Sequence, residues 1–233
     1  MLLLAIESAG PAASVALLDR RSARAGELTA FRTLPPGREQ ADRLIELVDG
    51  VLADAGIHPL QVELIAVGNG PGTFTGVRTA VAAARGLALA TGRGVLAVSS
   101  FEALACAALQ SRVGTVVAAL DARRGEVYAQ AFADDLRPLC EPAALPPEAA
   151  AQLARGPMVL VGSGARLVRA ALPGAAEAEV LPVELDARAV ALCAVRKLRA
   201  SAQPSAGFTV RPLYLRAPDA RPQRLGRTAV ALV

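Results

Sequence analysis

Residues 65–90 read IAVGNGPGTFTGVRTAVAAARGLALA and join a short apolar strand, a glycine-rich loop and a long apolar stretch. The loop has three glycines in five residues, so its backbone can turn sharply and approach neighbouring groups closely. We expect a helix from about Thr75 to Ala90. From residue 77 onward its polar side chains are Arg78, Thr79 and Arg85. A helix that is apolar almost all round is normally covered on more than one side, by its own domain or by another subunit.

The composition is that of a globular protein. Of 233 residues, 53% are hydrophobic and 20% are charged, and this length supports one domain with two lobes or two small domains. The opening MLLLAI is interrupted by Glu7. It is too short for a signal peptide or a membrane span, so we expect a buried first strand. The three cysteines are odd in number and widely spaced, which argues against a disulfide framework and favours the cytoplasm.

Positive charge gathers toward the C-terminus. The net charge is +4, and Lys197 is the only lysine. From Asp186 to the end, nine cations stand against two acids, Asp186 and Asp219. Such a tail could follow nucleic-acid phosphates, or it could simply be solvated, and the sequence leaves both interpretations open.

The first half of the chain predicts an α/β lobe. Runs at 2–7, 13–19 and 27–33, separated by turn residues, predict an antiparallel three-strand meander. Apolar residues at three- and four-residue spacing predict an amphipathic helix over 38–55, ended by Gly56 and Pro59. Further along we expect a strand at 63–67, the apolar helix, a strand at 95–98, and a helix capped by Ser99 or Ser100 with Glu102 in its first turn.

The pattern partly recurs in the second half. We expect strands at 113–120 and 126–133, a Pro- and Ala-rich connector over 136–147, a helix at 148–154, a strand at 158–161, and helices at 165–171 and 187–200. The repeat suggests two related lobes, although no residue-level repeat is visible. We place the N-terminal lobe at 1–110 and the C-terminal lobe with the basic tail at 111–233.

Several familiar sites are absent from the sequence. His58 is the single histidine and no C-x-x-C occurs, so no usual zinc spacing exists and we predict no metal site. A P-loop needs a lysine after its second glycine, and the only lysine stands far away at 197. The dinucleotide pattern G-x-G-x-x-G also fails, because Thr73 stands where the third glycine should be.

Three turns could hold an anion or Mg²⁺. Glu7 and Ser8 end the first strand before a hairpin, and Asp121 begins a second hairpin with the sequence DARRG. Gly162-Ser163-Gly164 stands at a strand-to-helix junction, where backbone N–H groups can face an anion. Each motif alone is also ordinary turn chemistry.

Several motifs together carry a family resemblance. They are LAIES (4–8) with SVAL (14–17), GPGTFTGVR (70–78), VSSFEAL (98–104), DARRGEVY (121–128) and RPLYLR (211–216). The chain resembles the bacterial TsaB (YeaZ) family of the actin-like, sugar-kinase-like ATPase superfamily, and the matching segments span nearly its whole length. The resemblance implies a two-lobed actin-like α/β fold in which each lobe is a mixed sheet flanked by helices.

The resemblance also implies a function. Members of this family take part in forming N6-threonylcarbamoyladenosine beside the anticodon of tRNAs that read codons starting with A. They are non-catalytic: they bind the paralogous transferase TsaD, the ATPase TsaE joins the assembly, and they form homodimers. The expected tRNA contact is indirect, through the complex, and no membrane is involved.

A nucleotide site, if one is retained, is expected to be vestigial. The catalytic paralogue holds a metal through a pair of histidines, which this chain's single histidine cannot reproduce. Glu7 stands where many ATPases of the superfamily have an aspartate. We therefore expect no cofactor, with residual nucleotide binding left open. The residues assigned to this vestigial site are Glu7, Ser8, Asp121, Gly162 and Gly164.

The resemblance places the docking surface on the two helices that flank the glycine loop. Small residues four apart would let a partner helix come close. The assigned interface residues are Leu44, Val48, Val51, Gly76, Ala80, Ala84 and Ala88, and those of the glycine loop are Gly70, Pro71, Gly72, Thr73, Phe74, Thr75 and Arg78. Val77, Val81 and Leu87 are expected to face the chain's own sheet. The alternative is that the helix is wholly buried within the monomer.

Three functions stay open at this point. The first is the non-catalytic subunit of the tRNA-modifying complex. The second is an autonomous actin-like ATPase or small-molecule kinase that uses Glu7 and Asp121 around Mg²⁺. The third is a glycoprotease-like peptidase, against which the missing histidine pair and the missing nucleophile constellation count heavily.

Overall fold

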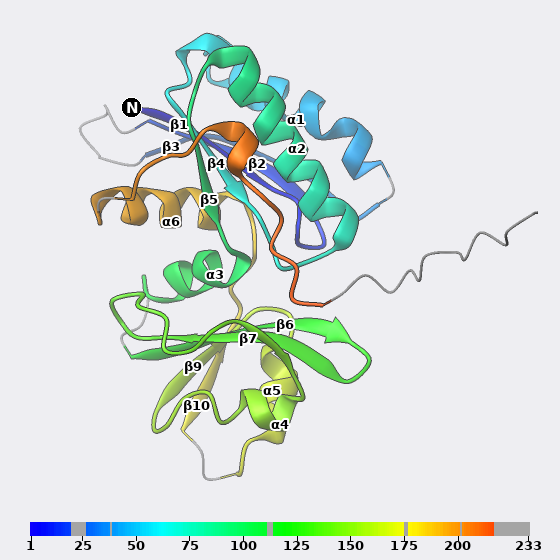
Figure 1. The fold of residues 1–233 in the computed structure, drawn as a ribbon, viewed down its shortest axis with the longest axis vertical. Coiled ribbons are helices and arrows are strands. Elements are labelled where there is room, and N and C mark those ends of the chain that lie inside the picture. The colour runs from blue at the N-terminus through cyan, green and yellow to red at the C-terminus, as the bar shows by residue number, and fades with distance from the viewer. Residues whose placement is uncertain (20–26, 38, 111–113, 175–176, 201, 217–233) are drawn as a thin grey trace, which may run out of the picture.

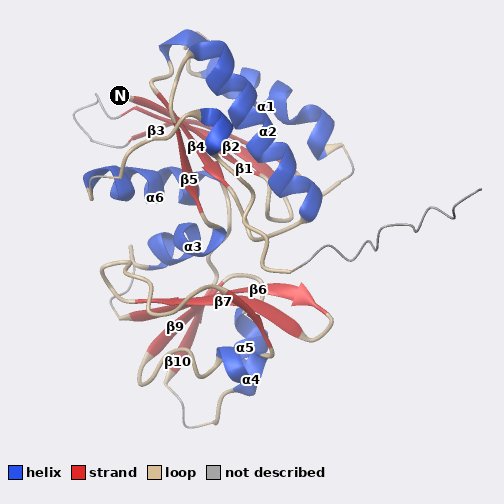
Figure 2. Ribbon diagram, in the orientation of Figure 1, coloured by secondary structure: helices blue, strands red, loops and turns tan. Residues whose placement is uncertain are grey.

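The computed structural model describes residues 1–19, 27–37, 39–110, 114–174, 177–200 and 202–216. Two sheets lie one above the other, with helices on their outer faces and between them (Figure 1). The layers run from a helix pair through the first sheet, a second helix pair and the second sheet to a third helix pair (Figure 2). This arrangement confirms the two-lobed α/β fold with a mixed, helix-flanked sheet in each lobe.

The first sheet has the strand order β3-β2-β1-β4-β5. Its strands are β1 (Leu2–Glu7), β2 (Ala13–Asp19), β3 (Glu27–Leu34), β4 (Leu64–Gly68) and β5 (Val95–Val98). The pairs β1–β2 and β2–β3 are antiparallel, while β1–β4 and β4–β5 are parallel. The predicted meander is therefore confirmed. The central strands β1 and β4 are buried along their whole length, because helices cover both faces of the sheet.

Four helices cover the first sheet. They are α1 (Gln40–Asp54), α2 (Phe74–Thr91), α3 (Ser100–Ala108) and α6 (Ala187–Arg199). The helices α1 and α2 pack on one face around Leu4 and Ile6, whereas α3 and α6 pack on the other around Leu3 and Ala5. This split follows from the alternation of side chains along β1. The short helix η1 (Pro59–Gln61) leads into β4, and the exposed His58 caps it.

The second sheet repeats this topology in the order β10-β9-β6-β7-β8. Its strands are β6 (Thr115–Arg123), β7 (Glu126–Phe132), β8 (Ala143–Leu145), β9 (Met158–Val161) and β10 (Ala178–Leu181). The outer helices are α4 (Pro147–Ala150) and α5 (Ala165–Ala171). On its inner face, Phe101 and Leu104 of α3 complete the core. The helix α3 therefore contributes to both lobes.

The chain returns to the first lobe after the second sheet. Helix α6 packs against β1, β2 and β4, and η2 (Gly207–Thr209) packs against α2. The predicted division at residue 110 is therefore wrong for these elements. A boundary drawn along the sequence misses them, because α6 buries its apolar face against the sheet formed by the first hundred residues.

Three smaller predictions differ from the structure. The connector over 136–147 contains β8, and β10 was not predicted; both are short edge strands without a strong apolar run. The helix predicted for 148–154 ends at Ala150. The remaining predicted elements match the described structure to within a few residues at their ends.

Candidate functional site

The glycine loop packs directly on the turn between β1 and β2. A Cβ atom on Gly72 would lie 2.3 Å from the carbonyl oxygen of Ala9, and one on Gly76 would lie 1.7 Å from that of Ser8. The backbone N–H of Thr73 donates to the Ala9 carbonyl at 2.9 Å. Because these positions are glycines, the backbone of the loop can contact the backbone of the turn. The need for close packing within the lobe therefore explains why the loop is rich in glycine.

The same loop ties three distant segments together. Gly70 has a φ of 98°, which favours glycine, and its carbonyl accepts from the N–H of Ser100 at 2.8 Å. The N–H of Leu213 donates to the carbonyl of Asn69 at 2.7 Å. The loop therefore joins the start of α3 to the C-terminal segment.

Arg78 lies in an exposed cluster at the first turns of α2. Its guanidinium carbon lies 3.6 Å from the centre of the Phe74 ring, and its Nε donates to the Tyr214 hydroxyl at 2.7 Å. Phe74 and Tyr214 are each about half exposed, at 51% and 47%. The sequence singled out the motifs that contain these residues, 70–78 and 211–216, but did not predict that they meet. The cluster holds the C-terminal segment against α2.

Glu7 is fully buried at the end of β1. Its Oε1 accepts from the N–H groups of Ala9 and Gly10, and its Oε2 has no partner among the described residues. Burial is the main cause that raises the pKa of Glu7 from 4.5 to about 7, and repulsion from Asp186 acts in the same direction. A Cβ atom on Gly68 would lie 1.6 Å from Oε2. The carboxyl group therefore closes its own turn.

Ser8 directly follows the end of β1 and lines a groove of about 400 Å³. The groove lies at the N-termini of α1 and α2, where Gln40, Thr73 and Thr75 also line it. Neither helix has a capping side chain. The Ser8 hydroxyl is buried and has no partner among the described residues. Of the five residues assigned to a vestigial nucleotide site, only Ser8 lines this groove.

The remaining members of that site belong to the second lobe. Asp121 Oδ1 accepts from the N–H of Arg123 at 2.8 Å and so closes the β6–β7 turn. A Cβ on Gly162 would lie 2.4 Å from the carbonyl of Ala119, and one on Gly164 would lie 2.9 Å from the carbonyl carbon of Leu120. Both glycines thus pack against β6. Nucleotide binding by this set stays a prediction.

The stripe predicted to dock a partner is buried in the monomer. Leu44, Val48, Val51, Ala80, Ala84 and Ala88 belong to one core cluster, and Gly76 is buried beside Ser8. Ala88 is covered by the C-terminal segment, since a Cβ on Gly207 would lie 2.6 Å from it. The assignment of these residues to a docking surface is corrected: the small side chains let α1 and the C-terminal segment approach α2. Val77 and Val81 are buried as predicted.

A different face of α2 is exposed. Ala82, Gly86 and Leu89 are exposed, and Leu89 reaches 88%. Ile45 of α1 is 47% exposed. A Cβ on Gly86 would meet nothing within 4 Å. The spacing of four and three residues puts Ala82, Gly86 and Leu89 on one side of the helix, and we call these three residues the α2 outer face.

Comparisons with known proteins identify the family. A family model described as TsaD, tRNA N6-adenosine threonylcarbamoyltransferase, matches residues 36–221. A solved structure of YeaZ from Pseudomonas aeruginosa is 31% identical, with a TM-score of 0.75, and covers 92% of this chain and 99% of its own. The chain belongs to the TsaB (YeaZ) family.

Curated TsaB relatives match more locally. Proteins named "tRNA threonylcarbamoyladenosine biosynthesis protein TsaB" from Haemophilus influenzae and Escherichia coli are 41% and 39% identical over 54% and 55% of this chain. The chain spans about half the length of these relatives, at 51% and 53%. An uncharacterized protein of Mycobacterium tuberculosis is 32% identical over 94% of this chain and 93% of its own length.

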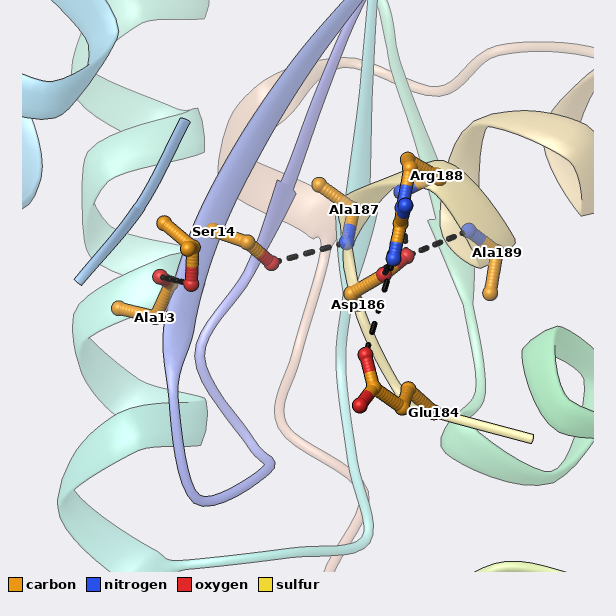
Figure 3. Close-up of polar contacts among 8 residues, drawn as sticks. Ala13, Ser14, Glu184, Asp186, Ala187, Arg188 and Ala189 are labelled. Atoms are coloured by element: carbon orange, nitrogen blue, oxygen red, sulfur yellow. Dashed lines mark hydrogen bonds and ion pairs between the residues drawn. The ribbon is translucent and has the colours of Figure 1, made fainter. Parts of the chain in front are cut away.

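In this TsaB-family chain, α6 is fixed at its N-terminus by a polar cluster (Figure 3). The Ser14 hydroxyl accepts from the N–H of Ala187 at 2.9 Å, which ties the helix to β2. Asp186 caps the helix by accepting from the N–H groups of Arg188 at 2.8 Å and Ala189 at 3.0 Å. The sequence reasoning used Asp186 only as a charge, although an aspartate directly before an apolar-periodic run is a capping signal.

Several C-terminal cations of the TsaB-family chain are structural. Lys197 donates to Glu102 at 2.7 Å, and Arg216 pairs with Glu126 and donates to the carbonyl of Ala122 at 3.0 Å. Residues 217–233 lie outside the described residues, so both interpretations of the basic tail, nucleic-acid binding and simple solvation, stay open. Within the described ranges, no group of three or more His, Cys, Asp or Glu could hold a metal ion. Within the same ranges, no helix is both long and apolar enough to span a membrane.

Proposed function

We propose that the chain is a non-catalytic subunit of the complex that forms N6-threonylcarbamoyladenosine next to the anticodon of tRNAs reading codons that start with A. In this role it binds and supports the catalytic paralogue TsaD. The proposal extends the names of the curated TsaB relatives and the TsaD description of the matching family model to this chain.

The observation that carries the proposal is the α2 outer face. Leu89 is 88% exposed on a helix whose opposite side is packed into its own lobe. Ala82 and Gly86 present little side-chain bulk beside it, so another helix can approach the backbone closely. Ile45 of the neighbouring α1 widens the apolar surface. A partner helix laid along α2 would bury all four residues.

The same face can serve more than one partner. We propose that it alternates between a second copy of the chain and TsaD, that TsaE joins the mixed complex, and that tRNA is contacted through the assembly. These steps belong to the cytoplasm, where tRNA is modified. No cofactor is assigned to the chain.

The geometry around Glu7 favours a supporting role over an autonomous ATPase. The carboxyl group of Glu7 is fully buried and accepts from N–H groups of its own turn, so it offers no solvent-exposed oxygen to a Mg²⁺ ion. The ATPase or kinase alternative predicts ATP turnover by the purified chain that Glu7→Ala abolishes. The peptidase alternative predicts proteolysis without any partner.

Reconstitution tests the proposed function. Threonine, bicarbonate, ATP and tRNA are combined with TsaD, TsaE and the other components of the modification, with and without this chain. We expect modified adenosine only when the chain is present, and no ATP turnover by the chain alone. Equal modification without the chain would contradict the proposal.

Variants of the outer face test the surface. Ala82→Glu and Leu89→Glu together place two carboxylates on the proposed contact, so binding of TsaD should weaken by at least about a hundredfold. Leu167→Glu on α5 is the matched control, because Leu167 is 42% exposed in the other lobe. Thermal unfolding confirms that both proteins fold. Unchanged binding by a folded outer-face variant would contradict the assigned surface.

A further inference from the structure

A second groove, of about 690 Å³, runs along α6 on the side away from the α2 outer face. Volumes of roughly 300–1,000 Å³ are typical of small-molecule sites. We call this groove along α6 the α6 groove. Its apolar wall is formed by Leu18, Leu28, Val183 and Leu192. The proposed function does not use this groove.

Three arginines of α6 line the groove, and one of them is fully engaged. Arg188 donates through Nε to Asp186 at 2.7 Å and forms an ion pair with Glu184 at 3.6 Å (Figure 3). Its guanidinium carbon also lies 4.5 Å from the centre of the Phe31 ring. Arg188 therefore pairs with both acids that line the groove, and these three side chains together carry a net charge of −1.

The other two arginines, Arg196 and Arg199, have no carboxylate partner. Among the described residues, neither side chain forms an ion pair. The nearby Glu102 is occupied by Lys197 at 2.7 Å. The segments 20–26 and 111–113, which adjoin the groove in sequence, contain no Asp or Glu. The groove lining therefore carries a net charge of +1, from three arginines and two acids, and among the described residues Arg196 and Arg199 are its cations without an ion pair.

Arg196 is half-buried and lies against the inner wall. The pKa of the buried Cys106 thiol is lowered, first by a hydrogen bond with Cys193 and then by the positive charge of Arg196, whose side chain also hydrogen-bonds the Cys106 sulfur. Both cysteines are almost fully buried, so this guanidinium reaches into the wall. A partly desolvated cation without a counter-ion is costly, and its place in the last turn of α6 offsets only part of that cost.

We propose that the α6 groove binds a small organic acid with an apolar body. The acidic head, a carboxylate or phosphate, accepts hydrogen bonds from Arg196 and Arg199, whose planar donor groups match such oxygens. The apolar body lies against Leu18, Leu28 and Leu192. The α6 groove is separate from the proposed partner surface on α2. An experiment can therefore contradict one of the two proposals and leave the other intact.

Two fluorescent probes test the charge requirement. 1-Anilinonaphthalene-8-sulfonate has an apolar aromatic body and an anionic head, while N-phenyl-1-naphthylamine has the same body without the charge. We expect saturable one-to-one binding of the sulfonate, at least about tenfold tighter than that of the neutral amine. We also expect decanoate to displace the sulfonate more effectively than decanol. Equal binding of both probes would overturn the proposal.

Variants locate the site. Arg196→Gln with Arg199→Gln should weaken sulfonate binding at least about tenfold and leave the neutral probe unchanged. Arg166→Gln, an exposed arginine on α5, is the matched control. Leu28→Glu should also weaken sulfonate binding, and it is less prone to unfold the protein because Leu28 is 44% exposed. Circular dichroism and thermal unfolding check the fold. Sulfonate binding that survives in the folded variants overturns the proposal.

Discussion

The two lobes share one sheet topology but differ in the length of the helices that cover the outer face of each sheet. Each sheet has a three-strand antiparallel half and two parallel strands, in the orders β3-β2-β1-β4-β5 and β8-β7-β6-β9-β10. The first lobe carries outer helices of 15 and 18 residues, and the second carries outer helices of 4 and 7 residues. Long outer helices bury one face and leave another to solvent. The first lobe therefore has a much longer outer helical layer than the second.

The acidic residues that close the first hairpin of each lobe, Glu7 and Asp121, also differ in how far they are covered. Glu7 is fully buried, whereas the side chain of Asp121 is 33% exposed, although each closes its own turn. In the first lobe, Gly68 at the end of β4 packs against the carboxyl group of Glu7, and the negative charge of Asp186 of α6 acts on it. Equivalent positions in a repeated topology thus differ in burial, and burial controls the protonation of the acid. The following predictions test this contrast, from the largest expected effect to the smallest.

Gly76→Ala should produce the largest loss of stability. The added Cβ would lie 1.7 Å from the Ser8 carbonyl, and a backbone atom cannot move aside cheaply. We expect a loss of about 3 kcal/mol or more in the free energy of unfolding, measured with urea. The control is Gly86→Ala in the same helix, which meets open space and should stabilise by about 0.5–1 kcal/mol. Equal effects of the two changes would contradict the packing described for the glycine loop.

The stability of the protein should fall as pH rises from about 4.5 to about 7. In this range folded Glu7 keeps its proton, whereas unfolded Glu7 has lost it, so the folded state binds more protons. The loss of unfolding free energy should be about 3 kcal/mol and should level off above the folded pKa.

Glu7→Gln isolates this contribution, because the amide cannot ionise. The variant should lose most of the decline measured by urea unfolding between pH 4.5 and 8. Asp121→Asn in the second lobe is the matched control and should keep the decline. A wild-type protein whose stability is flat across this range would argue against a protonated Glu7.

Lys197→Gln should weaken the attachment of α6 to α3. It removes the 2.7 Å bond to Glu102 and the 3.2 Å bond to the carbonyl of Ala97. Both charged side chains are about 30% exposed, so we expect a loss of about 1 kcal/mol in thermal or urea unfolding. Arg137→Gln, which loses only an exposed pair with Asp135, should change stability by less than about 0.5 kcal/mol. A similar result for both variants would mean that the Lys197 bonds contribute little.

Leu89→Gln should change stability least. Leu89 is 88% exposed, so the chain alone gains almost nothing from its side chain, and we expect a change within about 0.5 kcal/mol. Leu104→Gln, fully buried where α3 faces the second sheet, should cost several times more in the same urea titration. A large loss at Leu89 would mean that the outer face is already covered in the isolated protein.

The sequence alone determined most elements and the architecture. Apolar runs broken by turn residues located β1, β2, β4 and β9, because buried strands need continuous apolar side chains. Three- and four-residue spacing located α1 and α6. The motif at 70–78, with the others, pointed to the family. The edge strands β8 and β10 had no such signal, because half-covered three- and four-residue strands carry little pattern.

Only the tertiary structure decided which face of α2 is free. The sequence shows a helix apolar almost all round, so every stripe of it could meet a partner or the core. The small residues Gly76, Ala80 and Ala84 became the inner stripe because the β1–β2 turn and α1 pack there, and both contacts join residues distant in sequence. The return of α6 to the first sheet and the charge excess of its groove arise in the same way. The local sequence pattern specifies which side chains a segment can bury. The rest of the chain determines which other segment covers those side chains.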